Sequence, residues 1–332
     1  MEKKDFRLLS TKEENELSIT EKKEYYKQLR EYVKNRPLKV TTKGATTIAP
    51  KLKGITNILA KITCKLFTAP NVEWVVEGQE NLPNRNAIFA QTHQGILDNF
   101  VWIPEIEQHC IILHGAEVNK FLLAIQLNSG LVLVKKGDKE NNLNAKLDMI
   151  KLGCEGHSII YCPESTWNMS PNKLHLPINY GFLDVARKAN MPVIPLVHEF
   201  TYDTNTDKEK IIKIHSKFGK PIYISEKDDI FEKLAEYEEI ISTIKYELIE
   251  AKGLEKRANI SNLDYINFLK GNYRNLKLGK LDWEKEKRYI YGSTDEFYKF
   301  FHINDIPFDE NGNFLETKEV QKLKKINEQH HI

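Results

Sequence analysis

The sequence lacks long apolar runs, paired cysteines and a strong excess of either charge. No stretch approaches the roughly 18 apolar residues of a membrane-spanning helix, and the N-terminus has no apolar core of the signal-peptide type. None of the four cysteines belongs to a C-x-x-C pair, which argues against a zinc site and favours a reducing compartment. We therefore expect a cytoplasmic protein that is not integral to a membrane.

The overall composition is that of an ordinary soluble globular protein. The formal net charge is +2, so bulk charge gives no support to a nucleic-acid partner. Hydrophobic residues make up 41% and charged residues 29% of the 332 residues, which is enough to bury a substantial core. A chain of this length predicts one large domain with appendages, or two domains.

Two helices of different character are predicted near the N-terminus. Residues 1–36 are dense in Lys and Glu, and residues 19–33 are typical of a solvated helix with mixed charge pairs. Residues 48–67 place apolar residues at three- and four-residue spacing with lysines largely between them, which predicts an amphipathic cationic helix. Two interpretations of this second helix stay open: packing on the main domain, or lying on an anionic membrane surface.

Short apolar runs alternate with helical segments from about residue 72 onward. Strand-like runs cover residues 71–78, 87–92, 110–116, 130–137, 158–165, 192–200 and 210–218. Helix-compatible segments cover residues 98–109, 119–128, 142–153 and 178–190. The alternation predicts an α/β fold with a mostly parallel central sheet flanked by helices, and a ligand site at the carboxyl ends of the strands.

Composition divides the chain into three parts. Residues 1–70 form the charged and amphipathic helical N-terminal segment, and residues 71–254 form the predicted catalytic domain, which closes with a charged helix over 226–252. Residues 255–332 are polar with scattered aromatics and predict an irregular C-terminal appendage of unknown role.

His93 and Asp98 are the candidate catalytic pair, because they follow the strand-like run at 87–92. In one continuous helix their spacing would turn the chain by about 500° and point the side chains about 140° apart. They meet only if His93 lies on the turn after the strand and Asp98 lies inside the following helix, and Gly95 permits such a turn. Asp98 can then fix the imidazole tautomer and leave the other ring nitrogen to act as a base.

Four sequence blocks in order carry a family resemblance. They are THQGILDN at 92–99, GLVLVKK at 130–136, YCPESTWN at 161–168 and MPVIPLV at 191–197. Together they resemble the motifs of the lysophosphatidate and glycerol-3-phosphate acyltransferase family, over roughly residues 72–250. The resemblance implies the glycerol-phosphate acyltransferase-like fold.

The resemblance also implies a reaction. His93 would deprotonate a hydroxyl of a glycerolipid, lysolipid or glycan-type acceptor, which would attack the thioester of acyl-CoA or acyl-ACP. Glu164 would help to hold the acceptor. No metal and no bound cofactor are implied, since the acyl thioester is a co-substrate. Such chemistry fits a cytoplasmic enzyme, with peripheral attachment to the inner face of the membrane through residues 48–67 as an option.

Three positions depart from the family pattern. Ser165 replaces a glycine, Trp167 replaces an arginine, and the basic residue of the second block is Lys136, preceded by Lys135. Arginine offers phosphate a bidentate fork that tryptophan lacks, so we expect an acceptor other than glycerol-3-phosphate or lysophosphatidate. The predicted substrate-binding residues are Lys135, Lys136, Glu164, Ser165, Thr166 and Trp167.

Other functions remain open at this point. A non-catalytic relative that binds acyl or lipid ligands is compatible with the altered third block, and a scaffold that recruits partners through its terminal segments is a further alternative. A serine hydrolase is disfavoured because the G-x-S-x-G elbow is missing. Histidines without ligand spacing, which we interpret as structural or surface residues, are His109, His114, His157, His175, His198, His215 and His302.

Overall fold

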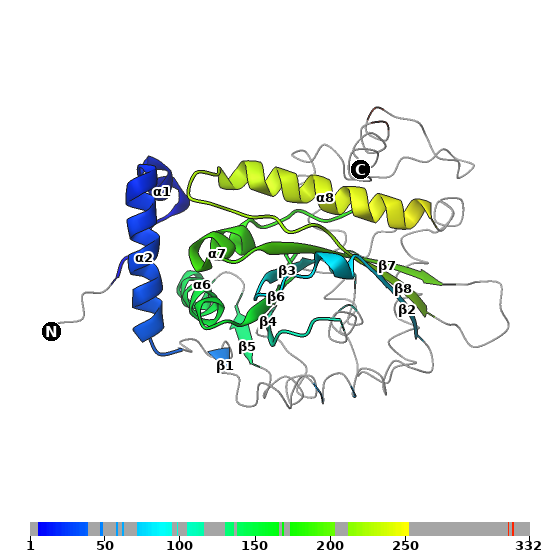
Figure 1. Cartoon of the computed structure of the whole chain (residues 1–332), viewed down its shortest axis with the longest axis horizontal. Coiled ribbons are helices and arrows are strands. Elements are labelled where there is room, and N and C mark those ends of the chain that lie inside the picture. The colour runs from blue at the N-terminus through cyan, green and yellow to red at the C-terminus, as the bar shows by residue number, and fades with distance from the viewer. Residues whose placement is uncertain are drawn as a thin grey trace.

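The computed structural model describes residues 6–38, 47–48, 58, 62, 72–94, 98, 105–115, 130–135, 138–165, 168, 173–202, 212–251, 318 and 321. These residues form an eight-stranded sheet with helices packed against it (Figure 1). The predicted α/β class with a mostly parallel central sheet and flanking helices is therefore confirmed.

All seven predicted strands are present, and a short eighth strand joins them at one edge. The strands are β1 (Thr47–Ile48), β2 (Val72–Glu77), β3 (Ile88–Gln91), β4 (Cys110–Gly115), β5 (Leu131–Val134), β6 (Ser158–Tyr161), β7 (Val193–Tyr202) and β8 (Ile212–Phe218). Their order across the sheet is β1-β5-β4-β6-β3-β7-β8-β2. The strands from β5 to β7 are parallel neighbours, whereas β1 and β8 run antiparallel to β5 and β7. The five parallel strands therefore end at one common edge.

The helices of the described residues are α1 (Thr11–Glu16), α2 (Ile19–Asn35), α6 (Lys139–Cys154), α7 (Gly181–Ala189) and α8 (Ile230–Glu250), with a 3-10 turn η1 (Gln79–Asn81). Capping boxes begin α1 and α2, where Ser10 and Ser18 each exchange hydrogen bonds with the glutamate at the third helical position. The predicted helices at 19–33, 142–153, 178–190 and 226–252 are thereby confirmed. Within this part of the chain, no helix has both the length and the apolar character needed to cross a bilayer.

Two hydrophobic cores lie on opposite faces of the sheet, because side chains alternate along each strand. On one face, Ile88 and Ala90 of β3 join a core that includes residues of α2, α6, α7 and α8. On the other face, Phe89 meets Phe218 of β8 with ring centroids 6.3 Å apart. β3 is therefore buried on both faces, which fixes the place where the following residues emerge.

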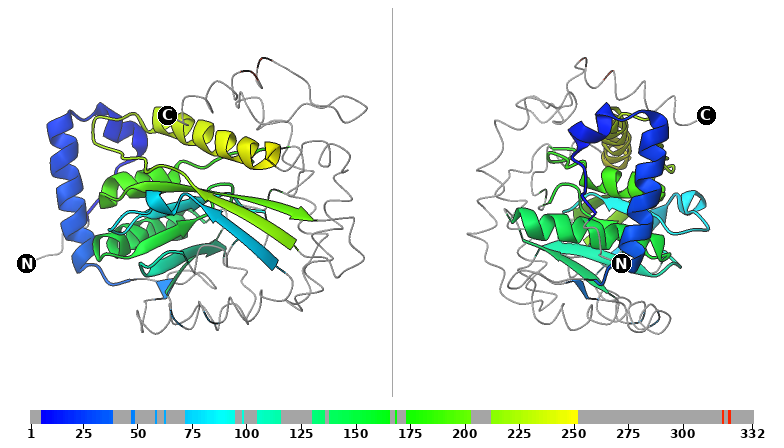
Figure 2. Two further views of the ribbon diagram at one scale, coloured as in Figure 1. Left: turned by 45° about the vertical axis from the view of Figure 1, so that its right-hand side comes forward. Right: turned by 90° about the vertical axis from the view of Figure 1, so that its left-hand side faces the viewer.

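Two of the predicted helices differ from expectation. α2 is not a solvated helix, because Tyr26, Leu29 and Val33 are fully buried where α2 stands across α6 and α7 (Figure 2). The helix predicted at 98–109 is wrong over residues 105–109, which form a turn and a bend. The segment predicted as a helix at 119–128 lies outside the described residues.

The predicted amphipathic helix at 48–67 and the appendage at 255–332 fall largely outside the described residues. Ile48 belongs to β1 instead of a helix. Ile58 and Ile62 have helical backbone and are 61% and 49% exposed. These two apolar side chains are therefore not covered by the domain.

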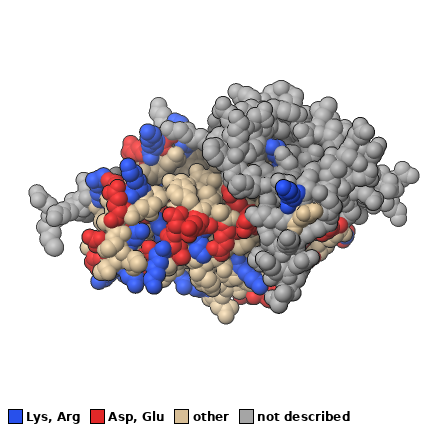
Figure 3. Space-filling view, turned by 90° about the horizontal axis from the view of Figure 1, so that it is seen from above, with Lys and Arg blue, Asp and Glu red and all other residues tan. Residues whose placement is uncertain are grey.

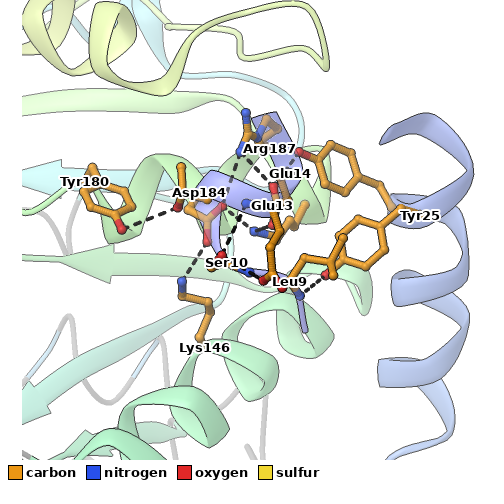
Figure 4. A network of polar contacts seen from close by, with 12 residues as sticks. Leu9, Ser10, Glu13, Glu14, Tyr25, Lys146, Tyr180, Asp184 and Arg187 are labelled. Atoms are coloured by element: carbon orange, nitrogen blue, oxygen red, sulfur yellow. Dashed lines mark hydrogen bonds and ion pairs between the residues drawn. The ribbon is translucent and has the colours of Figure 1, made fainter. Parts of the chain in front are cut away.

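A buried group of charged residues, here named the Glu14 cluster, fastens α1 to α7 and α6 (Figure 4). Glu14 accepts from Arg187 at 3.0 Å and pairs with Lys188 at 2.5 Å. Asp184 pairs with Lys188 at 2.5 Å and with Lys146 of α6 at 2.8 Å. Burial alone would raise the pKa of the Asp184 carboxyl, but Lys188 and Lys146 outweigh it and hold that pKa well below its usual range.

α8 turns an acidic face outward. Glu232, Glu236 and Glu239 are exposed on it, and Figure 3 shows acidic side chains gathered on this side of the molecule. Negative charge repels an anionic bilayer. Any contact with such a surface would therefore use another face.

Candidate active site

The carboxyl ends of β6, β3 and β7 lie side by side in the sheet. Ile88 of β3 pairs with Ile159 of β6 on one side and with Val193 of β7 on the other. Because this register is parallel, the residues that follow these strands emerge at the same edge. His93 follows β3 and Glu164 follows β6, so the fold brings two distant parts of the sequence together there.

His93 and Asp98 are in contact: His93 lies outside regular structure shortly after β3, and Asp98 has helical backbone. Nδ1 of His93 is 3.2 Å from Oδ2 of Asp98, and the same oxygen accepts the backbone N–H of Gln94 at 2.5 Å. The side chain of Asp98 is fully buried, whereas that of His93 is 15% exposed. The pair therefore offers an imidazole that is anchored through one nitrogen and can be reached from solvent.

Glu164 reaches from the loop after β6 to the main chain of His93. Its Oε1 accepts the backbone N–H of His93 at 3.0 Å, and its Oε2 accepts that of Leu176 at 2.8 Å. Burial raises the pKa of the Glu164 carboxyl to about 7, although the two backbone donors and His93 all act in the opposite direction. This carboxyl therefore changes its charge near neutral pH.

The segment that contains Glu164 makes two further features of the site. The backbone N–H of Asn168, a buried residue, donates to the carbonyl oxygen of His93 at 2.5 Å. Ser165 has a φ of 58°, in the left-handed region, and its N–H donates to the carbonyl oxygen of Cys162 at 3.0 Å. The family pattern has glycine at this position, so the chain keeps a backbone shape suited to glycine with a serine in its place.

A buried histidine supports the end of β3. The backbone N–H of His198 in β7 donates to Oγ1 of Thr92 at 3.0 Å, and Nδ1 of His198 lies 2.8 Å from Oγ of Ser216. Burial lowers the pKa of His198 to about 4, so its ring is neutral at physiological pH. This placement agrees with the structural interpretation of His198.

The predicted substrate-binding residues are distributed unevenly. Glu164 is beside His93, and Ser165 is exposed next to Glu164. Lys135 is exposed after β5, which β4 and β6 separate from β3. Three predicted residues lie outside the described part of the chain: Lys136, Thr166 and Trp167.

Sequence reasoning did not single out Thr92 or Asn168. Both residues lie within blocks that carry the family resemblance, so the region was found but their contacts were not. These contacts depend on the register of β3 against β6 and β7, which the residue types do not reveal.

The arrangement suits proton transfer at a hydroxyl. An imidazole held by a carboxylate can accept a proton, and the carboxylate then stabilises the imidazolium. No set of three or more His, Cys, Asp and Glu side chains in the described residues is placed to hold a metal ion.

Comparison with known proteins shows which family this part of the chain is similar to. The model of the Acyltransferase family matches residues 73–199, a stretch that includes β3 to β6 and both His93 and Asp98. Residues 73–199 are therefore similar to the acyltransferase family.

A solved structure is also similar to the chain. It is the crystal structure of the 1-acyl-sn-glycerophosphate (LPA) acyltransferase, PlsC, from Thermotoga maritima, with 22% sequence identity and a TM-score of 0.46. The match covers 58% of this chain and 79% of that chain. Comparison with curated proteins gives no match.

Proposed function

We propose that the chain is an O-acyltransferase that moves an acyl group from acyl-CoA or acyl-ACP onto a hydroxyl of a glycerolipid, lysolipid or glycan-type acceptor. The observation that carries the proposal is the contact of 3.2 Å between His93 and Asp98 within the stretch that matches the acyltransferase family model. The partial exposure of the imidazole supports it, because a general base must reach the proton that it removes.

The reaction would pass one proton through His93 and replace a thioester bond by an ester bond. Nε2 of His93, the nitrogen that Asp98 does not contact, takes the proton of the acceptor hydroxyl. The oxygen attacks the thioester carbonyl carbon and a tetrahedral oxyanion forms. The C–S bond then breaks, and the thiolate receives the proton from the imidazolium, which Asp98 stabilises until that moment. The products are an ester and a free thiol.

The acceptor would lie over the loop after β6. Ser165, exposed beside Glu164, supports this placement, as does the position of Glu164 against His93. The replacement of the family's arginine by Trp167 favours an acceptor without a phosphate to bind. The remaining proposed contacts come from Lys135, Lys136 and Thr166.

The test is a product assay on the purified protein with palmitoyl-CoA and a panel of acceptors. The panel contains lysophosphatidate, glycerol-3-phosphate, a neutral lysolipid and a disaccharide. We expect an ester product with a phosphate-free acceptor, and about a hundredfold to ten-thousandfold less product with His93→Ala. Robust turnover of lysophosphatidate would defeat the acceptor proposal alone. Acyl-CoA binding without turnover, unchanged in His93→Ala, would support the non-catalytic relative.

The proposed location is the cytoplasm, with peripheral attachment to the membrane through residues 48–67. The exposed Ile58 and Ile62 support this attachment, since apolar side chains next to lysines suit an anionic lipid surface. We expect the double variant Ile58→Glu, Ile62→Glu to lose flotation with liposomes that contain phosphatidylglycerol. Leu143→Glu, which changes an exposed leucine on α6, is the matched control and should float like the wild type. Equal flotation of all three proteins would remove the proposal.

A further inference from the structure

Both polar groups of the His93 main chain are held by one segment, the residues that follow β6. Glu164 accepts the N–H of His93 at 3.0 Å, and the N–H of Asn168 donates to the carbonyl oxygen of His93 at 2.5 Å. Asn168 is anchored in turn, because its side-chain amide donates to the carbonyl oxygen of Lys173 at 2.9 Å. Glu164 and Asn168 therefore bind the main-chain N–H and the main-chain carbonyl of His93.

The contacts of Glu164 differ from those expected of a residue that holds an acceptor. Each carboxyl oxygen accepts a backbone N–H, one from His93 and one from Leu176. The residue is 5% exposed, whereas the neighbouring Ser165 is exposed. An incoming hydroxyl compound would thus meet Ser165 more readily than the carboxyl beside it.

We propose that Glu164 is a positioning residue, which fixes the main chain of His93 together with Asn168 and does not bind the acceptor. This inference rests on the proposed function, because it assigns Glu164 a part in placing the general base. It departs from the role that the family resemblance implies for Glu164. Among the described residues of this loop, Ser165 then remains the proposed contact for the acceptor.

Two carboxylates would share the task of placing the imidazole. Asp98 holds the ring through Nδ1, and Glu164 holds the peptide that carries the ring. The two contacts together restrict both the backbone and the side-chain rotation of His93. Such restriction matters because a displacement of about 1 Å at a reacting group can cost about a hundredfold in rate.

The kinetic test uses Glu164→Gln with palmitoyl-CoA and the acceptor that the wild type esterifies. Glutamine keeps one acceptor oxygen but sets an NH₂ group against one of the two backbone N–H groups. We expect kcat to fall by about tenfold to a hundredfold, while the KM for the acceptor changes less than about twofold. A rise in that KM with kcat unchanged would overturn the proposal, since it would mean that Glu164 binds the acceptor. Glu238→Gln, which alters a half-buried carboxyl on α8, should change neither constant.

A second test follows amide hydrogen exchange by NMR and needs no turnover. In Glu164→Gln, exchange should speed up at His93 and Leu176, while exchange at Phe89 in β3 stays as in the wild type. Equal acceleration at Phe89 would mean that the whole sheet opens more easily. Unchanged exchange at His93 would mean that Glu164 does not hold the His93 main chain. Either result contradicts the proposal.

A third measurement covers the case in which Glu164→Gln does not fold. In the wild type, the NMR chemical shift of the Glu164 carboxyl carbon, followed against pH, gives the titration curve of Glu164 separately from those of His93 and Asp98. The amide protons of His93 and Leu176 should shift together along that same curve, because each hydrogen-bonds to that carboxyl. Amide proton shifts of His93 and Leu176 that do not follow the Glu164 titration would overturn the proposal. If the wild type transfers no acyl group, the proposed function fails, while these two NMR measurements still decide whether Glu164 holds His93.

Discussion

The Glu14 cluster and the candidate active site both bury charged groups, but they satisfy them in different ways. In the cluster, the carboxylate of Glu14 meets the cations of Arg187 and Lys188 directly. At the active site, Asp98 and Glu164 accept backbone N–H groups, and Asp98 adds contact with an imidazole. The cluster joins helices that are distant in sequence, whereas the candidate site holds one imidazole ring.

The difference appears in how readily the carboxyls change charge. Within the cluster, the neighbouring lysines hold the pKa of Asp184 well below its usual range, so it stays ionised. At the site, burial raises the pKa of Glu164 to about 7. Direct ion pairs are thus found where α1 joins α7, and a carboxyl that titrates near neutral pH is found beside the proposed base.

The largest expected effect comes from breaking the site at Asp98. Asp98→Asn keeps the size of the side chain but removes the charge that would stabilise an imidazolium, so acyl transfer should fall about a hundredfold to ten-thousandfold. Product formation per folded molecule is the measurement, with thermal unfolding as a check of folding. Asp228→Asn, at a partly exposed carboxyl that accepts from Ser225, serves as control and should retain full activity. Normal activity of Asp98→Asn would refute the assigned pair.

Breaking the Glu14 cluster should instead affect stability. Glu14→Ala leaves the buried cations Arg187 and Lys188 without this partner, and we expect a loss of about 3–5 kcal/mol in the free energy of unfolding. Chemical denaturation measures it, and the folded fraction should keep its kcat. Glu16→Ala, at an exposed position of the same helix, should cost far less. Similar losses for the two variants would mean that the cluster adds no stability.

A smaller effect is expected in the pH dependence of stability. The folded protein keeps the Glu164 proton up to a pKa of about 7, whereas an ordinary glutamate loses it near 4.5. Wild-type stability should therefore decrease as the pH rises from about 4.5 to about 7, because the folded state binds the proton more tightly than the unfolded state. Glu164→Gln cannot titrate, so its Tm relative to wild type should rise across this window. Parallel Tm profiles would contradict the shifted pKa.

The smallest expected effect concerns the backbone at Ser165. Its φ of 58° is a conformation that glycine adopts without strain, so Ser165→Gly should stabilise the protein by about 1 kcal/mol. Asn190 has a similar φ of 55°, but asparagine tolerates that region, so Asn190→Gly should give a smaller gain. Denaturation curves of both variants provide the comparison. A loss of stability in Ser165→Gly would show that its hydroxyl contributes more than the strain costs.

The sequence predicts the central sheet well because buried parallel strands are short apolar runs with clear ends. It does not predict β1, since two residues carry no periodic signal and their partners in β5 are distant in sequence. The burial of α2 was missed because its many charges hide Tyr26, Leu29 and Val33, which share one side of the helix.

The candidate site was predicted in part. The spacing of His93 and Asp98 is a local signal, and the two side chains are in contact as that spacing predicts. Glu164 was found from its motif, but its hydrogen bond to the His93 main chain depends on β3 and β6 lying side by side. Contacts set by sheet register could not be read from residue types alone.

β1 has a consequence for how the protein can be shortened. Thr47 and Ile48 pair with Val132 and Leu131 at the outer edge of β5, and the Thr47 hydroxyl donates to Asp148 of α6 at 2.5 Å. A fragment that begins at residue 71 would contain the family-matched stretch but leave the hydrogen-bonding groups of that edge open to other molecules. Bare strand edges recruit further strands, so the fragment should aggregate. Solubility of the family-matched part would thus depend on residues that lie outside it in sequence.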